Sequence, residues 1–118
     1  MRIGVPKEIK NHEYRVGLTP SSAREVVAGG HEVLVERSAG AGIGATDAAY
    51  QKAGARIVGT ADDVFAEADM IVKVKEPQAV EIARLRPGQV LFTYLHLAPD
   101  PEQCQGLIAS GAVCIAYE

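Results

Sequence analysis

Short apolar runs alternate with capped helical segments along the whole chain, and this alternation limits the folds that the sequence can adopt. Each apolar run is short enough for a strand, and a capping residue followed by proline opens helical segments at Thr19-Pro20 and Asp100-Pro101. Strands and helices that alternate in this way pair in parallel through right-handed crossovers. The sequence therefore predicts an α/β fold with a doubly wound, mostly parallel sheet, a three-layer sandwich of flavodoxin-like or Rossmann-like type.

The pattern sets approximate bounds for each element. Glycine closes several helical segments, at Gly30, Gly54 and Gly111, where a left-handed residue can end the helix. No low-complexity linker or shift in composition divides the chain, so we expect residues 1–118 to form one domain. The expected strands are 2–5, 32–36, 56–58, 70–74, 90–97 and 112–116, and the expected helices are 20–29, 47–54, 60–68, 78–85 and 101–111.

Composition narrows the classes of partner. The formal net charge is −3 and no basic stripe is present, which excludes nucleic acid and anionic membranes as electrostatic partners. The apolar runs are far shorter than the roughly 20 residues of a membrane helix, and the N-terminus lacks the apolar core of a signal peptide. Cys104 and Cys114 have no metal-like spacing and are expected to be reduced thiols. We therefore expect a cytoplasmic protein.

The run Val90–Leu97 is the most strand-like stretch, and it contains a histidine near its end. If the run is extended throughout, its side chains alternate, and Tyr94 and His96 share a face. Ligands of open α/β sheets bind at the carboxyl ends of the strands, where His96 is expected. Imidazole titrates near neutral pH, so His96 is our first candidate for a proton donor and acceptor.

Lys75 is the second candidate, because it follows the apolar run 70–74 and is expected at the same sheet edge. Its ammonium group can hold a carbonyl or carboxylate oxygen by a charge-assisted hydrogen bond. The alternative, which is the more common one, is a lysine that reaches into solvent from a strand end. Lys73 shares the predicted face of Lys75 and competes with it for either role.

Arg15 is the third candidate, in the polar segment that follows the first strand. Its planar guanidinium suits bidentate capture of a substrate carboxylate. The alternative is a surface arginine paired with Glu8 or Glu13. Charged or titratable groups at the ends of the first, fourth and fifth strands can converge on one cleft and bind a small anionic substrate there.

Other motifs are weaker. The segment Gly40–Gly44 has the spacing G-x-G-x-G, which is shorter than the dinucleotide fingerprint G-x-G-x-x-G, so we interpret it as a glycine turn. We therefore expect no cofactor-binding residues in this segment. His12 and His31 lie in predicted loops or turns without a second ligand at metal-binding spacing, and no metal site is expected.

Four segments resemble the N-terminal part of bacterial alanine dehydrogenases, a family related to the α subunit of nicotinamide nucleotide transhydrogenase. They are Arg2–Asn11, Glu13–Val16 leading to Thr19-Pro20, Val72–Pro77 and Leu91–Ala98. The resemblance covers the whole chain, and His96 resembles the dehydrogenase branch, since transhydrogenases usually lack this histidine. The departures are His12, where the family signature prefers Asn, and Gly17, where it prefers Ala.

The resemblance implies NAD-dependent oxidative deamination of L-alanine to pyruvate and ammonium, and the reverse reaction. It further implies that Arg15 and Lys75 bind the substrate, that His96 and Lys75 are catalytic, and that the full-length protein is a homo-oligomer, a hexamer in this family. NAD would be bound mainly by a second domain that this chain lacks.

We therefore expect residues 1–118 to be a substrate-binding domain that is inactive alone and exposes an apolar patch. The alternatives are a binding module for a small 2-oxo or amino acid without turnover, a transhydrogenase-like domain, and a purely structural domain.

Overall fold

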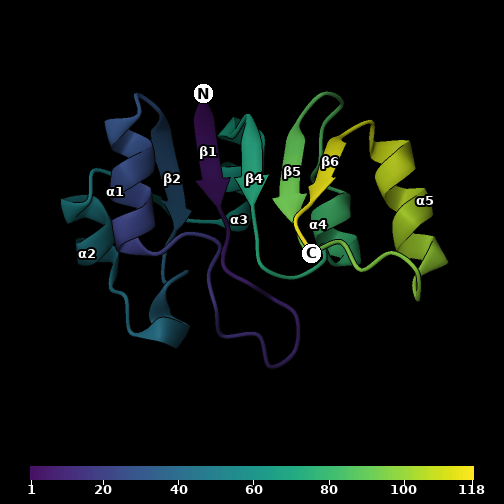
Figure 1. The fold of residues 1–118 in the computed structure, drawn as a ribbon, viewed down its shortest axis with the longest axis horizontal. Coiled ribbons are helices and arrows are strands. Elements are labelled where there is room, and N and C mark those ends of the chain that lie inside the picture. The colour runs from purple at the N-terminus through teal and green to yellow at the C-terminus, as the bar shows by residue number, and fades with distance from the viewer.

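The computed structural model describes residues 1–118, and its centre is a six-stranded sheet in the order β3-β2-β1-β4-β5-β6 (Figure 1). Every neighbouring pair of strands is parallel. This is the order of the Rossmann fold rather than that of flavodoxin, and it confirms the predicted α/β class. The strands are β1 (Arg2–Val5), β2 (Glu32–Glu36), β3 (Arg56–Val58), β4 (Met70–Val72), β5 (Val90–Thr93) and β6 (Val113–Ala116).

The helices begin at the capping residues that the sequence indicated. The side chains of Thr19, Thr46, Thr60 and Asp100 each accept a backbone N–H of the first helical turn, which satisfies a donor that the helix leaves free. None of the helices is both long and apolar enough to cross a lipid bilayer. The helices are α1 (Pro20–Ala28), the 3₁₀ turn η1 (Ala41–Ile43), α2 (Asp47–Lys52), α3 (Ala61–Glu67), α4 (Ala79–Ile82) and α5 (Pro101–Ser110).

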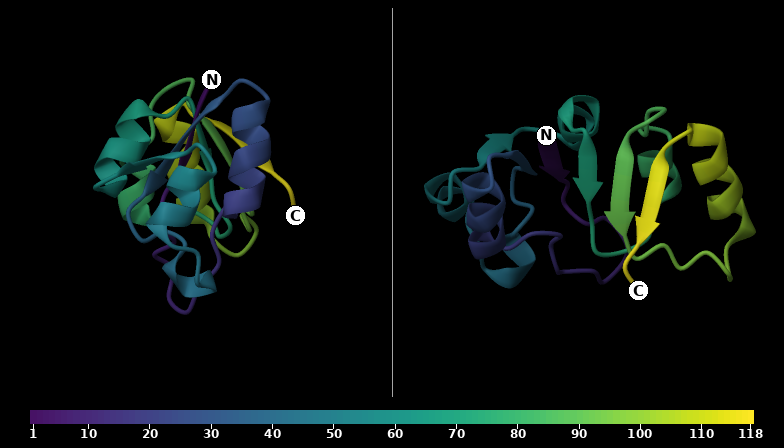
Figure 2. Two further views of the ribbon diagram at one scale, coloured as in Figure 1. Left: turned by 90° about the vertical axis from the view of Figure 1, so that its left-hand side faces the viewer. Right: turned by 45° about the horizontal axis from the view of Figure 1, so that its top comes forward.

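The sheet lies between two layers of helix, as the edge-on view at the left of Figure 2 shows. One apolar cluster joins α3 and α5 to the sheet through residues such as Phe65, Leu91 and Leu107. A second cluster joins α1 and α2 to the opposite face through Val33, Val35 and Tyr50. Burial of these two clusters from water provides the main favourable contribution to folding.

One half of the second face has no helix over it. In the right-hand view of Figure 2, β5 and β6 face the viewer without a covering helix. Val113, Ile115 and Tyr117 are 51%, 45% and 38% exposed, respectively. Val113 and Ile115 are in register with Val90 and Phe92 of β5, so the exposed side chains form a continuous apolar area across both strands. This area matches the expected apolar patch.

Two strands end earlier than the sequence suggested. β4 ends at Val72, and the chain bends at Val74 and Lys75. β5 ends at Thr93, whereas we expected it to reach Leu97. His96 has a φ of 47°, in the left-handed region, so the simple alternation of side chains cannot extend to it. The expectation that Tyr94 and His96 belong to one regular strand face was therefore wrong.

Candidate functional site

The carboxyl ends of the parallel strands all lie at the lower edge of the sheet in Figure 1. Lys75 and His96 line the same cavity there, with a volume of about 190 Å³. Pockets for drug-sized ligands are typically about 300–1,000 Å³, so this cavity suits a molecule of few heavy atoms. Its remaining lining residues are Lys10, Glu76, Tyr94 and Glu118.

Arg15 lies beside this cavity rather than in it. It lines a neighbouring cavity of about 340 Å³ with Val74, Tyr94 and Tyr117. Tyr94 lines both cavities, so the two cavities are adjacent. The structure therefore brings the three predicted residues to one sheet edge, in two adjacent hollows.

Glu13 holds the guanidinium of Arg15. The Arg15 Nε and Nη2 atoms donate to the two Glu13 carboxylate oxygens at 2.9 and 2.8 Å, and the Arg15 backbone N–H adds a third bond at 2.9 Å. The hydrogen bond from Arg15 lowers the pKa of Glu13 to about 2. The surface pairing considered as an alternative is thus present, with Glu13 as the partner.

This pairing leaves one end of the Arg15 guanidinium without a hydrogen-bond partner. A guanidinium has five N–H donors, and Glu13 takes the edge formed by Nε and Nη2. Nη1 makes no hydrogen bond in the chain, and the Arg15 side chain is 57% exposed. Glu13 therefore orients Arg15 and still allows its end to accept a second carboxylate.

Lys73 lies in a different environment from Lys75. Its ammonium group is 3.0 Å from Glu8 Oε1 and 3.1 Å from Glu81 Oε2, and all three side chains are at most 2% exposed. A buried charge is tolerated only when it is paired and hydrogen-bonded. Burial raises the pKa of Glu81, although the Lys73 charge acts in the opposite direction. Lys73 is thus part of a buried ion cluster, and only Lys75 faces a cavity.

The backbone of Lys75 is fixed on both sides. Its N–H donates to Glu8 Oε1 at 3.1 Å, and its carbonyl oxygen accepts the Thr93 hydroxyl at 3.0 Å. The Lys75 side chain is half-buried and forms no ion pair within the chain. Its three ammonium donors are available to an oxygen of a small molecule in the cavity.

His96 is held by its backbone, and its ring is exposed. Both carboxylate oxygens of Glu118 accept the His96 N–H, each at 3.1 Å, and one of them also accepts the Leu95 N–H at 2.7 Å. The imidazole makes no hydrogen bond within the chain, so both ring nitrogens are free for proton transfer.

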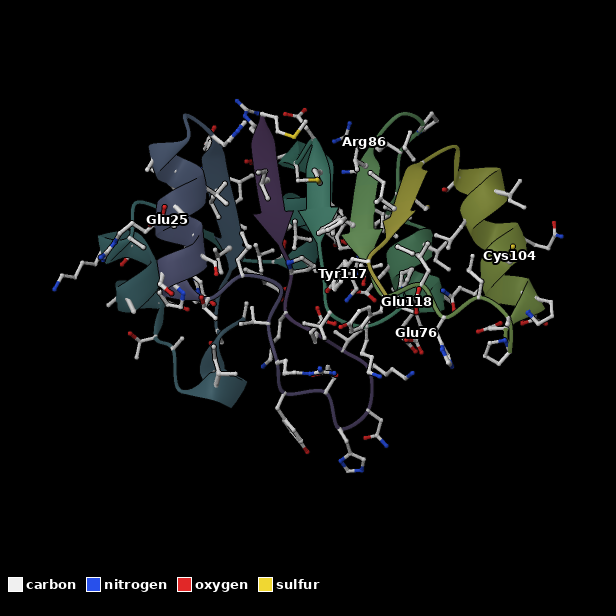
Figure 3. All side chains as sticks on the ribbon, viewed as in Figure 1. Glu25, Glu76, Arg86, Cys104, Tyr117 and Glu118 are labelled. Carbon is white, nitrogen blue, oxygen red and sulfur yellow. The ribbon has the colours of Figure 1, made fainter.

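Aromatic rings form one wall of the site. The Tyr117 ring lies 4.5 Å from that of Tyr94 and 4.7 Å from that of Phe92 between centroids, and its hydroxyl donates to the Lys73 carbonyl oxygen at 2.5 Å. Burial raises the pKa of Tyr117. Figure 3 shows Tyr117 and Glu118 just below the ends of β5 and β6, with Glu76 nearby. The two residues that follow the last strand therefore form part of the site.

The largest cavity lies elsewhere. It has a volume of about 600 Å³, lies between α4 and α5, and includes none of Arg15, Lys75 and His96. Lys10 and Glu76 form an ion pair at the boundary between this cavity and that of Lys75. The smaller hollow is the better candidate site because it brings a free cation and a free imidazole together.

The glycine-rich segment supports the Arg15 loop. A Cβ atom on Gly42 would lie 2.2 Å from the Tyr14 carbonyl oxygen, so the two backbones are in direct contact. The segment itself forms a 3₁₀ turn of three residues, Ala41–Ile43, rather than the start of a helix that could face a pyrophosphate. These features do not fit a dinucleotide site and match the expected glycine turn.

Three features of the site escaped sequence reasoning. Glu8 was considered only as a partner for Arg15, whereas it binds Lys73 and the Lys75 backbone. A lysine within an apolar strand signals a buried carboxylate partner, but several glutamates were available. Tyr117 and Glu118 gave no signal, because their roles depend on β6 lying beside β5.

The sequence of the chain matches a known protein family. The model of the alanine dehydrogenase/PNT N-terminal domain matches residues 4–118. An alanine dehydrogenase from Halomonas elongata is 58% identical over 118 residues, which are 100% of this chain and 32% of that protein. The chain thus spans about a third of the length of this relative.

Solved structures agree with this match. An L-alanine dehydrogenase superposes with a TM-score of 0.97 at 51% identity, over 100% of this chain and 32% of the other. A transhydrogenase from Sinorhizobium meliloti superposes with a TM-score of 0.92 at 34% identity, over 98% of this chain and 34% of the other. The chain therefore belongs to the alanine dehydrogenase/PNT N-terminal domain family.

Proposed function

We propose that residues 1–118 are the substrate-binding part of a longer NAD-dependent L-alanine dehydrogenase. The observation that carries this proposal is the small cavity that Lys75 and His96 share, beside the free end of Arg15. The similarity to proteins named alanine dehydrogenase supports the same reaction. In this role the chain binds L-alanine or pyruvate and contributes the proton-transfer group.

Each residue has a distinct role in the proposed reaction. The free end of Arg15 binds the substrate carboxylate, and the Lys75 ammonium binds the oxygen at the reacting carbon of pyruvate. His96 accepts a proton from the substrate nitrogen or oxygen during oxidation and returns it in the reverse direction. NAD, when bound by the remainder of the protein, supplies the hydride acceptor.

The chain alone is proposed to be inactive in hydride transfer. The glycine-rich segment does not fit a dinucleotide, and the chain spans about a third of the length of its relatives, so we propose that NAD binds to the remainder of the full-length protein. We also propose that the full-length protein is a cytoplasmic homo-oligomer, as the composition of the chain and its resemblance to the family lead us to expect.

An assay of NADH formation tests this proposal. The full-length protein should reduce NAD with L-alanine, and the purified 118-residue chain should not. A full-length protein that forms no NADH from L-alanine and no NAD from pyruvate, ammonium and NADH would refute the proposed reaction. NADH formation by the 118-residue chain would refute the proposal that the chain alone is inactive in hydride transfer.

A transhydrogenase-like role is the second candidate, because one similar structure is a transhydrogenase. His96 favours the dehydrogenase, since a reaction that moves hydride between two nucleotides needs no proton-transfer group for an amino acid. Hydride transfer between two nicotinamide nucleotides without any turnover of alanine would support this second candidate.

A further inference from the structure

The buried carboxylate of Glu8 contacts the chain where it leaves β4. Glu8 Oε2 accepts the Val74 N–H at 3.2 Å, and Glu8 Oε1 accepts the Lys75 N–H at 3.1 Å. The Glu8 side chain is 1% exposed. Both oxygens of one buried carboxylate are thus engaged at the bend that precedes the Lys75 side chain.

These contacts fix the direction in which Lys75 leaves the sheet. β4 has already ended at Val72, and no backbone carbonyl accepts the N–H of Val74 or Lys75. The carbonyl groups of the bend are bound by β5 and the residue after it. The Thr93 hydroxyl donates to the Lys75 carbonyl oxygen, and the Tyr94 N–H donates to the Val74 carbonyl oxygen. The Val74–Lys75 segment is therefore fixed between Glu8 and β5.

The side chains of Lys73 and Glu81 complete the cluster, and neither forms a hydrogen bond with this segment. The Lys73 ammonium bridges Glu8 and Glu81, which compensates the buried negative charge. The other oxygen of Glu81 accepts the Gln78 N–H at the start of α4. Glu8 and Glu81 thus share a charge partner, but only Glu8 contacts the backbone of Lys75.

We propose that Glu8 is a positioning residue that directs the Lys75 ammonium into the cavity of His96 by holding the Val74 and Lys75 N–H groups. The inference rests on the proposed function to the extent that Lys75 binds a 2-oxo acid. A shift of about 1 Å in a binding group is enough to weaken such a site strongly. Glu8 need not touch the substrate to have this effect.

The test is pyruvate binding by the full-length Glu8→Gln variant. A glutamine has the shape of glutamate, but its NH₂ group cannot accept a backbone N–H, so one of the two hydrogen bonds is lost. The dissociation constant for pyruvate should rise at least about tenfold, which corresponds to about 1.4 kcal/mol. Affinity for NADH should stay within about twofold, because we propose that NAD binds to residues outside this chain.

Glu81→Gln is the matched control. It removes the same charge from the same buried cluster and leaves both N–H bonds at the bend intact. The thermal stability of Glu81→Gln should fall by about as much as that of Glu8→Gln. Its affinity for pyruvate should stay within about twofold of that of the wild type. Equal losses of pyruvate affinity in the two variants would overturn the proposal in favour of a purely structural cluster.

A double-mutant cycle tests whether Glu8 acts through Lys75. In a Lys75→Met background, Glu8→Gln should cause no further loss of pyruvate affinity. Additive losses would overturn the proposal. If Glu8→Gln does not fold, the triple variant Glu8→Gln/Lys73→Met/Glu81→Gln removes all three buried charges together and should show the same selective loss of pyruvate affinity.

The outcome also separates this inference from the proposed function. A wild type that neither oxidises alanine nor binds pyruvate refutes the function. An active wild type whose Glu8→Gln and Glu8→Gln/Lys73→Met/Glu81→Gln variants bind pyruvate normally refutes only the role of Glu8.

Discussion

Lys73 and Lys75 are separated by one residue, yet their ammonium groups lie in opposite environments. Lys73 is 1% exposed between two carboxylates, whereas Lys75 lines an open cavity and has no ion pair within the chain. The bend at Val74 and Lys75 causes this difference, because it breaks the extended alternation that would give both side chains the same face. Substitution of Lys73 should therefore lower the stability of the fold, whereas substitution of Lys75 should leave it almost unchanged.

Lys73→Met should lower the free energy of unfolding by about 3–5 kcal/mol, because it leaves two buried carboxylates without their cation. Lys75→Met should change the free energy of unfolding by less than about 0.5 kcal/mol. Urea denaturation of the two variants measures both values. A destabilised Lys75→Met protein together with an unaffected Lys73→Met protein would reverse our assignment.

The acidity of Glu13 offers a second test. The folded pKa of about 2 lies below the ordinary value of 4.5, so the Glu13–Arg15 pair stabilises the fold fully above pH 4.5. That stabilisation should disappear as the pH falls from 4.5 to about 2. NMR titration of the Glu13 carboxyl carbon should give the low midpoint in the wild type and a midpoint near 4.5 in Arg15→Met. An ordinary midpoint in the wild type would show that the pair does not form in solution.

Gly42→Ala tests the support of the Arg15 loop. The new methyl group would meet the Tyr14 carbonyl oxygen at 2.2 Å, so the loop must move. We expect a loss of about 1–3 kcal/mol in unfolding free energy and weaker pyruvate binding. Gly59→Ala is a suitable control, since its nearest neighbour is 4.0 Å away. Equal behaviour of the two variants would contradict the proposed packing.

The uncovered face of β5 and β6 predicts self-association of the 118-residue chain, because large exposed apolar areas favour contact between molecules. Sedimentation equilibrium should show oligomers that become monomers in the double variant Val113→Lys/Ile115→Lys. Ile108→Lys serves as a control, since Ile108 is 68% exposed on α5, away from this face. A wild type that stays monomeric at high concentration would contradict this prediction.

The sequence predicted most of the fold because the relevant signals are local. Caps such as Thr19 and Asp100 and short apolar runs located nearly every element. It did not predict the ends of β4 and β5, because partners distant in the sequence set them. Glu8 holds the bend at Lys75, and Glu118 holds the left-handed backbone of His96.

The candidate site was predicted in part for the same reason. The placement of Lys75 and His96 at one sheet edge follows from parallel strands, and the structure puts both in one cavity. The choice between Lys73 and Lys75 required the fold, because alternation gives both residues the same face. Whether Glu13 occupies Arg15 or orients it depends on which edge of the guanidinium is used, which no sequence pattern reveals.

Pyruvate titration of the full-length protein and its Lys75→Ala variant tests the central claim most directly. The account predicts saturable binding by the wild type and a roughly tenfold to hundredfold weaker affinity in Lys75→Ala, because a charge-assisted hydrogen bond is lost. Lys52→Ala, on α2 and away from the site, should bind as the wild type does. Pyruvate binding of equal strength in the wild type and Lys75→Ala would contradict the account.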